Sequence, residues 1–171
     1  LYLICDSYRD AYRHPLLAAA NWLLPPNVFY AEQHPVDGTV DGKTLRSKVT
    51  VMSLRDFQRG CSPAWFESYI WGRFAQPTCI LYVRDTKLRA NIEASLSEAA
   101  RTLLRNALPA LPPEGSLTAL WEQSLSLSYA TELRTERSGR AQELVQSSMD
   151  FYAALTRAHA AHLGFSFALY E

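Results

Sequence analysis

The sequence has few cysteines, few glycines and few lysines. Its three cysteines, Cys5, Cys61 and Cys79, lie far apart, and no Cys/His spacing suggests zinc. Their odd number and wide separation favour free thiols in a reducing compartment. The seven glycines are scattered and form no phosphate-binding loop. There are 14 arginines and 3 lysines. This bias is compatible with phosphate contacts, but a GC-rich genome produces it too, and we favour the genome.

Long apolar runs and net charge are also absent. Since no apolar run reaches 18 residues, no transmembrane helix is predicted. The formal net charge is zero, so no overall field attracts nucleic acid, and no nucleic-acid partner is predicted. With 48% hydrophobic residues, the 171-residue chain can form a real core. Residues 1–5 have the composition of a strand already under way, and we expect further sequence before them.

Hydrophobic spacing predicts an α+β fold. The predicted strands cover residues 1–5, 28–32, 48–53 and 78–83. Helices are predicted from Pro15 to residue 24, over 54–59, and over 65–74 with Ser62 and Pro63 as its cap. After residue 84 only helices are expected: one over 88–107, one capped by Ser116 and one over 144–163. The predicted domains are therefore 1–84, mixed α/β, and 85–171, helical.

Arg73 is the first candidate site residue. It follows Gly72 at the end of an aromatic helical segment, and a guanidinium group matches the geometry of phosphate oxygens. The alternative is a surface arginine that pairs with Glu67 or lies at the helix C-terminus. Spacing alone favours this alternative.

Tyr129, Glu132 and Arg134 form a second candidate group. On a helix, Tyr129 and Glu132 share a face, which could line a cleft or be a solvated helix end. Asp6 and Glu32 end strands but have no partner at metal-ligand spacing. His159 lies on a helical stripe and is predicted to pack between helices. Trp22–Pro26 could touch a membrane, although core packing is the preferred interpretation.

Several segments together resemble the Tam41-type (MMP37-like) mitochondrial and bacterial phosphatidate cytidylyltransferases. The family has a Lys-Tyr-Gly-Val-Ile-Ser-like strand, an "AGRL.KP" stretch, an "L..AN" helix start and an "LSY.GD.R" segment. The corresponding segments here are 48–53, 72–77, 88–91 and 127–134. Order and spacing agree from about Lys48 to Leu155. Gln76 replaces a basic residue of the family, and Thr131-Glu132 stand where the family has Gly-Asp.

The resemblance implies a partial nucleotidyltransferase-like mixed sheet followed by a winged-helix-like helical domain. It implies an enzyme that makes CDP-diacylglycerol from CTP and phosphatidic acid with Mg²⁺, in peripheral contact with a membrane. The expected location is the cytoplasmic face of a bacterial inner membrane or the matrix side of the mitochondrial one. The implied nucleotide- or phosphate-binding residues are Lys48, Arg73, Tyr129, Glu132 and Arg134. The acidic metal ligands are expected before Leu1.

Two alternatives follow from the same residues. One is a nucleotidyltransferase relative with another phosphate acceptor. The other is an inactive helical module, in which the half after residue 84 binds a partner. Acidic metal ligands in the sequence before Leu1 would favour catalysis.

Overall fold

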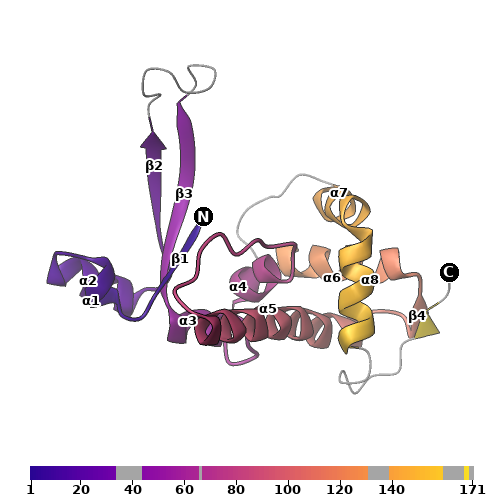
Figure 1. The fold of residues 1–171 in the computed structure, drawn as a ribbon. Helices are drawn as coiled ribbons and strands as arrows, with labels where there is room; N and C mark the ends of the chain where they lie inside the picture. The colour runs from indigo at the N-terminus through magenta and orange to yellow at the C-terminus, as the bar shows by residue number, and fades with distance from the viewer. Residues whose placement is uncertain (34–43, 66, 131–138, 160–167, 170–171) are drawn as a thin grey trace. The chain divides into compact units, whose positions relative to one another are not determined.

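The fold was analysed in a computed structural model (Figure 1). It describes residues 1–33, 44–65, 67–130, 139–159 and 168–169. The chain forms two compact units, Leu1–Phe57 and Gln58–Glu171. Residues 58–84, predicted to belong with the mixed α/β part, are thus in the second unit. The division of the chain into the two domains of the resembled family, 1–84 and 85–171, stays a prediction.

The first unit is built on a mixed sheet. Its strands are β1 (Tyr2–Cys5), β2 (Asn27–Gln33) and β3 (Leu45–Ser53), in the order β1-β3-β2. β1 runs parallel to β3, with Cys5 opposite Ser53, and β2 runs antiparallel to β3, with Tyr30 opposite Lys48. The three strands predicted over 1–5, 28–32 and 48–53 are confirmed, and so is the mixed α+β class. The turns expected at residues 37–38 and 41–42 lie outside the described residues.

Short helices accompany this sheet. α1 (Tyr8–Ala11) is capped by Ser7, whose hydroxyl accepts the Arg9 N–H at 3.1 Å. α2 (Pro15–Leu23) begins with a proline, as predicted, because its missing N–H would have no partner in the first turn. α3 (Leu54–Gly60) follows β3 directly, and the Ser53 hydroxyl accepts the Asp56 N–H at 3.1 Å.

The core packing preferred for Trp22–Pro26 is wrong for Trp22, Leu23 and Leu24. The structure leaves these three side chains largely exposed, and Pro25 and Pro26 are half-buried. The reason is that Ala18 and Asn21 occupy the buried side of α2.

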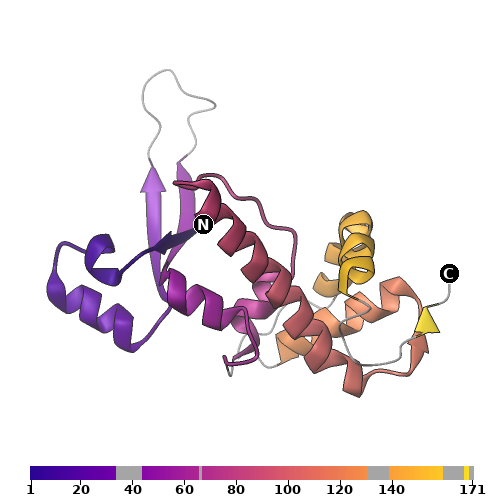
Figure 2. The same cartoon turned by 60° about the horizontal axis from the view of Figure 1, so that its bottom comes forward.

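The second unit consists mainly of helices packed around Trp121 and Tyr152. Its elements are α4 (Ser68–Phe74), α5 (Thr86–Ala107), η2 (Leu108–Ala110), β4 (Glu114–Gly115), α6 (Leu117–Ala130), α7 (Arg140–Ser147), α8 (Met149–His159) and β5 (Ala168–Leu169). α4 packs against both α5 and α6 (Figure 2). The buried residues of α5 and α6 include Leu103 and Leu125. Ser116 caps α6 as predicted, since its hydroxyl accepts the Ala119 N–H at 3.1 Å.

Four local predictions in this unit are wrong. Residues 78–83 form no strand: Leu81 and Tyr82 are exposed, and strand propensity needs a neighbouring strand to be realised. The half after residue 84 is not wholly helical, because β4 and β5 pair in parallel. Ser62 does not cap α4, because the N-cap of this helix is Glu67. The Ser62 hydroxyl donates instead to the Arg59 carbonyl.

The fourth concerns the last helix, which is two helices, α7 and α8, separated at Ser148. Serine side chains compete with the helical hydrogen bonds of the backbone, and the Ser147 hydroxyl bonds to the Leu144 carbonyl at 3.0 Å.

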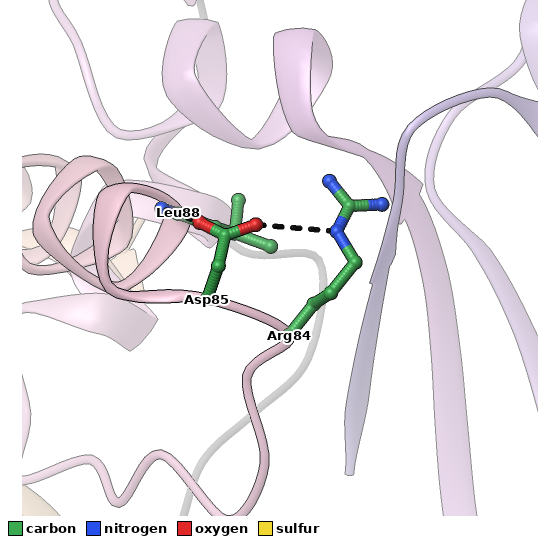
Figure 3. Close-up of polar contacts among 3 residues, drawn as sticks. All are labelled: Arg84, Asp85 and Leu88. Atoms are coloured by element: carbon green, nitrogen blue, oxygen red, sulfur yellow. Dashed lines mark hydrogen bonds and ion pairs between the residues drawn. The ribbon is translucent and has the colours of Figure 1, made fainter.

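Asp85 begins the longest described helix and supports a stability prediction (Figure 3). One carboxylate oxygen accepts the Leu88 N–H at 2.7 Å and the other accepts Arg84 Nε at 3.3 Å. The hydrogen bond from the Leu88 N–H has the largest effect, followed by that from Arg84, and both lower the pKa of Asp85 below its ordinary value of 3.8. This stabilisation is therefore present above the unfolded-state pKa and is lost as pH falls through the lower folded-state pKa.

We expect Asp85→Ala to lower the Tm by a few degrees at neutral pH and to have less effect in acid. Asp85→Asn is the matched control, because it keeps the acceptor and removes only the charge. It should lose less stability than the alanine variant and should lack the pH dependence that the carboxylate gives. Thermal unfolding followed by circular dichroism across pH measures both effects. An equal deficit of the alanine variant at acid and neutral pH would contradict the prediction.

Candidate functional site

The structure brings the helix that carries Arg73 against the helix that carries Tyr129. α4 and α6 approach closely at Gly72, where an added Cβ would lie 2.9 Å from the Ser128 Cβ and 3.0 Å from its Oγ. One turn earlier, the buried Ser68 hydroxyl donates to the Ser128 carbonyl at 2.9 Å. Two segments about 55 positions apart in the sequence, 72–73 and 128–129, are thus joined by direct packing.

Small residues permit this approach. Ser68 and Gly72 are four positions apart and so lie on one face of α4, where they present little bulk to α6. The Gln76 side chain, which replaces a basic residue of the resembled family, is buried and donates to the Gly72 carbonyl at 3.0 Å. The Ser-x-x-x-Gly spacing is visible in the sequence, but its partner on α6 is not. Sequence reasoning therefore missed Ser68 and the contact with Ser128.

Arg73 is half-buried in the last turn of α4. Its guanidinium carbon lies 5.9 Å from the centre of the Tyr69 ring, one turn earlier, which is a cation–π distance. Within the described ranges, the ion pair with Glu67 that spacing favoured does not form. Arg73 does lie at the C-terminal end of α4, the second position that this alternative gave it, and a positive charge there interacts favourably with the helix dipole. At this distance the ring attracts the positive charge and leaves the N–H groups of Arg73 available as donors.

Tyr129 is half-buried near the end of α6, next to Ser128. Burial raises the pKa of the Tyr152 hydroxyl above its ordinary value, and the nearby Tyr129 adds a smaller effect in the same direction. The predicted site residues Glu132 and Arg134 lie outside the described residues.

Lys48 belongs to the first unit, where it lies exposed on β3. Its Nζ is 5.6 Å from the centre of the Tyr30 ring on the neighbouring strand β2. Its backbone carbonyl accepts the amino group of Leu1 at 2.9 Å. The side chain is thus a solvent-accessible cation beside an aromatic ring. Of the five predicted site residues, the structure joins the helices of Arg73 and Tyr129.

The carboxyl ends of the parallel strands β1 and β3 carry another polar group. The hydroxyls of Tyr8 and Ser53 both donate to one Asp56 oxygen at 2.7 Å. Burial, with a smaller contribution from this carboxylate, raises the pKa of Tyr8 to about 12. Asp56 is thus occupied in holding α3 and α1 against the sheet.

Metal binding has little support from the side chains that can be placed. In the parts of the chain that the structure describes, no three His, Cys, Asp or Glu side chains form a group suited to a metal ion. Glu32, a strand-end carboxylate, pairs with exposed Arg46 at 2.9 Å. His159 is buried and contacts the Ser97 hydroxyl at 3.2 Å, which confirms its predicted packing role. These residues do not fit the predicted Mg²⁺.

Neither the protein-family models nor the curated proteins contain a match to this chain. Among the described residues, no helix combines the length and the apolar character needed to cross a membrane.

Proposed function

We propose that this chain is part of a CTP-dependent nucleotidyltransferase of the phosphatidate cytidylyltransferase type. The carrying observation is the packing of Gly72 against Ser128, which puts the helix of Arg73 beside the helix of Tyr129. These residues belong to two of the four segments that carry the resemblance, 72–77 and 127–134. A contact between them is what a shared nucleotide or phosphate site requires.

In the proposed reaction, an oxygen of the phosphatidic acid phosphate attacks the α-phosphate of CTP. A new phosphorus–oxygen bond forms, the bond to pyrophosphate breaks, and CDP-diacylglycerol results. Negative charge collects on the phosphate oxygens, and a fixed guanidinium stabilises it. Arg73 has this role, with Tyr69 limiting the orientations of its side chain. Lys48, Tyr129, Glu132 and Arg134 remain predicted contacts.

Mg²⁺ would supply additional neutralisation of the phosphate charge when bound. The described carboxylates form no ligand group for it. The requirement for Mg²⁺ stays a prediction. The proposed place of action is the membrane surface that holds phosphatidic acid, on the cytoplasmic side in bacteria or the matrix side in mitochondria.

We expect Arg73→Ala to lower CDP-diacylglycerol formation by about 10²–10³-fold, the usual effect of removing one donor to a developing charge. The assay incubates the full-length protein with Mg²⁺, labelled CTP and phosphatidic acid. Arg105→Ala is the matched control, because Arg105 is an exposed arginine in the last turn of α5, and it should retain activity. Arg73→Lys should recover only part, since an ammonium lacks the planar fork.

The other outcomes distinguish the alternatives. CTP binding without product would move the proposal to a different phosphate acceptor. No CTP binding would favour the inactive helical module. Product formation that is equal in the wild type and in Arg73→Ala would remove Arg73 from the site.

A further inference from the structure

Helix α2 has its apolar side chains on the outside. Leu16, Trp22 and Leu23 are 72%, 70% and 69% exposed, whereas Ala18 and the polar Asn21 are almost fully buried. The Asn21 amide oxygen accepts the Tyr12 hydroxyl on the inner side. Among the described elements, α2 packs chiefly against α1. Burial of leucine and tryptophan is the usual driving force for packing a helix, and here that surface is left unused.

The exposed surface of α2 covers most of the helix. Each residue turns an α-helix by about 100°. The buried positions 18 and 21 lie on one side, and Leu16, Ala19, Ala20 and Leu23 form a stripe on the opposite side. Leu17, Leu24 and Trp22 widen this stripe on both flanks. Together they make an apolar arc of about 220°, roughly twice the stripe that a helix of a globular protein needs for packing.

The charge pattern and the width of the arc distinguish the possible occupants. Residues 15–31 contain no charged side chain. Exposed Asp6, Arg9, Asp10 and Arg13 precede them, and their formal charges cancel, so neither α2 nor the segment before it carries a net charge. A second protein surface covers one stripe and would leave the remaining leucines in water. The interfacial layer of a bilayer is deformable and takes up the broad apolar face of a helix that lies in its plane, and tryptophan favours the lipid–water boundary.

We propose that α2 inserts its outward face into the interfacial layer of a lipid bilayer, with Leu16, Leu23 and Trp22 as the inserted side chains. Arg9 and Arg13 remain at the level of the headgroups. The helix lies in the plane of the interface and does not cross it. The biological role of this membrane binding rests on the proposed function, in which the phosphate acceptor is a lipid. The binding itself needs neither CTP nor an intact phosphate site.

Vesicle co-sedimentation of the full-length protein, without nucleotide, tests the proposal. One set of vesicles is phosphatidylcholine and the other is phosphatidylcholine with phosphatidylglycerol. We expect the wild type to bind both sets to a similar extent, because the inserted surface carries no charge. Leu16→Glu and Leu23→Glu should each reduce partitioning by about tenfold or more, because each removes one buried leucine. Leu81→Glu changes a leucine that is 77% exposed outside α2 and should bind as the wild type does.

Tryptophan fluorescence gives an independent measurement. Trp22 is exposed, whereas Trp71 and Trp121 are buried and Trp65 is half-buried. Brominated phosphatidylcholine should therefore quench part of the wild-type emission, and Trp22→Phe should abolish that part while the protein still binds. Arg73→Ala should bind vesicles normally, which separates failure of this proposal from failure of the phosphate site.

Three results would overturn the proposal. The first is unchanged binding of Leu16→Glu and Leu23→Glu to both kinds of vesicle. The second is vesicle binding without quenching of Trp22. The third is absence of vesicle binding by the wild type. A wild-type dimer, detected by sedimentation velocity, that the glutamate variants dissociate would then assign the α2 face to a second copy of the chain.

Discussion

Replacement of Trp121 by alanine is expected to lower the free energy of unfolding by about 3–5 kcal/mol. Trp121 is completely buried, and its ring centre lies 4.7 Å from that of Tyr152. Its indole N–H donates to the Thr156 hydroxyl at 2.8 Å, and this hydroxyl donates to the Tyr152 carbonyl at 2.9 Å. The substitution therefore removes the largest buried side chain, an aromatic contact and a hydrogen bond that joins α6 to α8. A loss of this size is a large fraction of a typical domain's stability.

Urea unfolding followed by far-ultraviolet circular dichroism measures this loss without using tryptophan emission. Trp121→Phe keeps a ring but loses the N–H, so its stability should lie between those of wild type and alanine variant. Tyr152→Phe is the matched control within the same contact. Among the described residues the Tyr152 hydroxyl is buried without a hydrogen-bond partner, so its removal should be neutral or stabilising. A Trp121→Ala protein as stable as Tyr152→Phe would contradict the assigned core.

The second large effect is expected at Gly72. Gly72→Ala places a Cβ within 2.9 Å of the Ser128 Cβ, so α4 and α6 must separate. Overpacking costs about 1–3 kcal/mol, and the better helix propensity of alanine offsets up to about 1 kcal/mol of it. We expect a net loss of about 1–2 kcal/mol in unfolding free energy. Under the proposed function, displacement of the two helices should also reduce activity by about 10²-fold.

A double-mutant cycle tests whether this contact causes the loss. Ser128→Gly removes the two atoms that the new Cβ would meet, so the double variant should recover about 1–2 kcal/mol relative to additivity. Gly139→Ala is the control. Gly139 has a positive φ of 92° and nothing within 4 Å of an added Cβ, so its cost is conformational. Gly139→Ala should show no coupling to Ser128→Gly, and coupling of equal size would refute the contact argument.

Sequence periodicity was sufficient for the elements whose cause is local. The β-branched alternation of 48–53 and the proline at position 15 each depend on a few neighbouring residues, and both predictions are confirmed. The strand predicted over 78–83 has equally good local propensity but does not form, because a strand also needs a partner. The single last helix was wrong for a related reason: the apolar stripe continues through 147–148, but the backbone does not.

The candidate site shows the same division. Residue chemistry alone indicated Arg73 as a possible phosphate ligand and Glu67 as its competing partner. Only the folded chain shows that Arg73 lies beside Tyr69 and that Gly72 contacts Ser128. Glu132 and Arg134 lie outside the described residues, so their roles remain predictions from the sequence.

The sequence by itself determined the α+β class, the starts of α2, α3 and α6 and the strands of the first unit, because capping, proline placement and side-chain alternation act over a few residues. The tertiary structure decided which surfaces stay exposed and which distant segments touch. Burial is a property of the whole chain: the same leucines on α2 would be core residues if another element covered them. The outward apolar face of α2 and the approach of α4 to α6 could therefore be seen only in the folded chain.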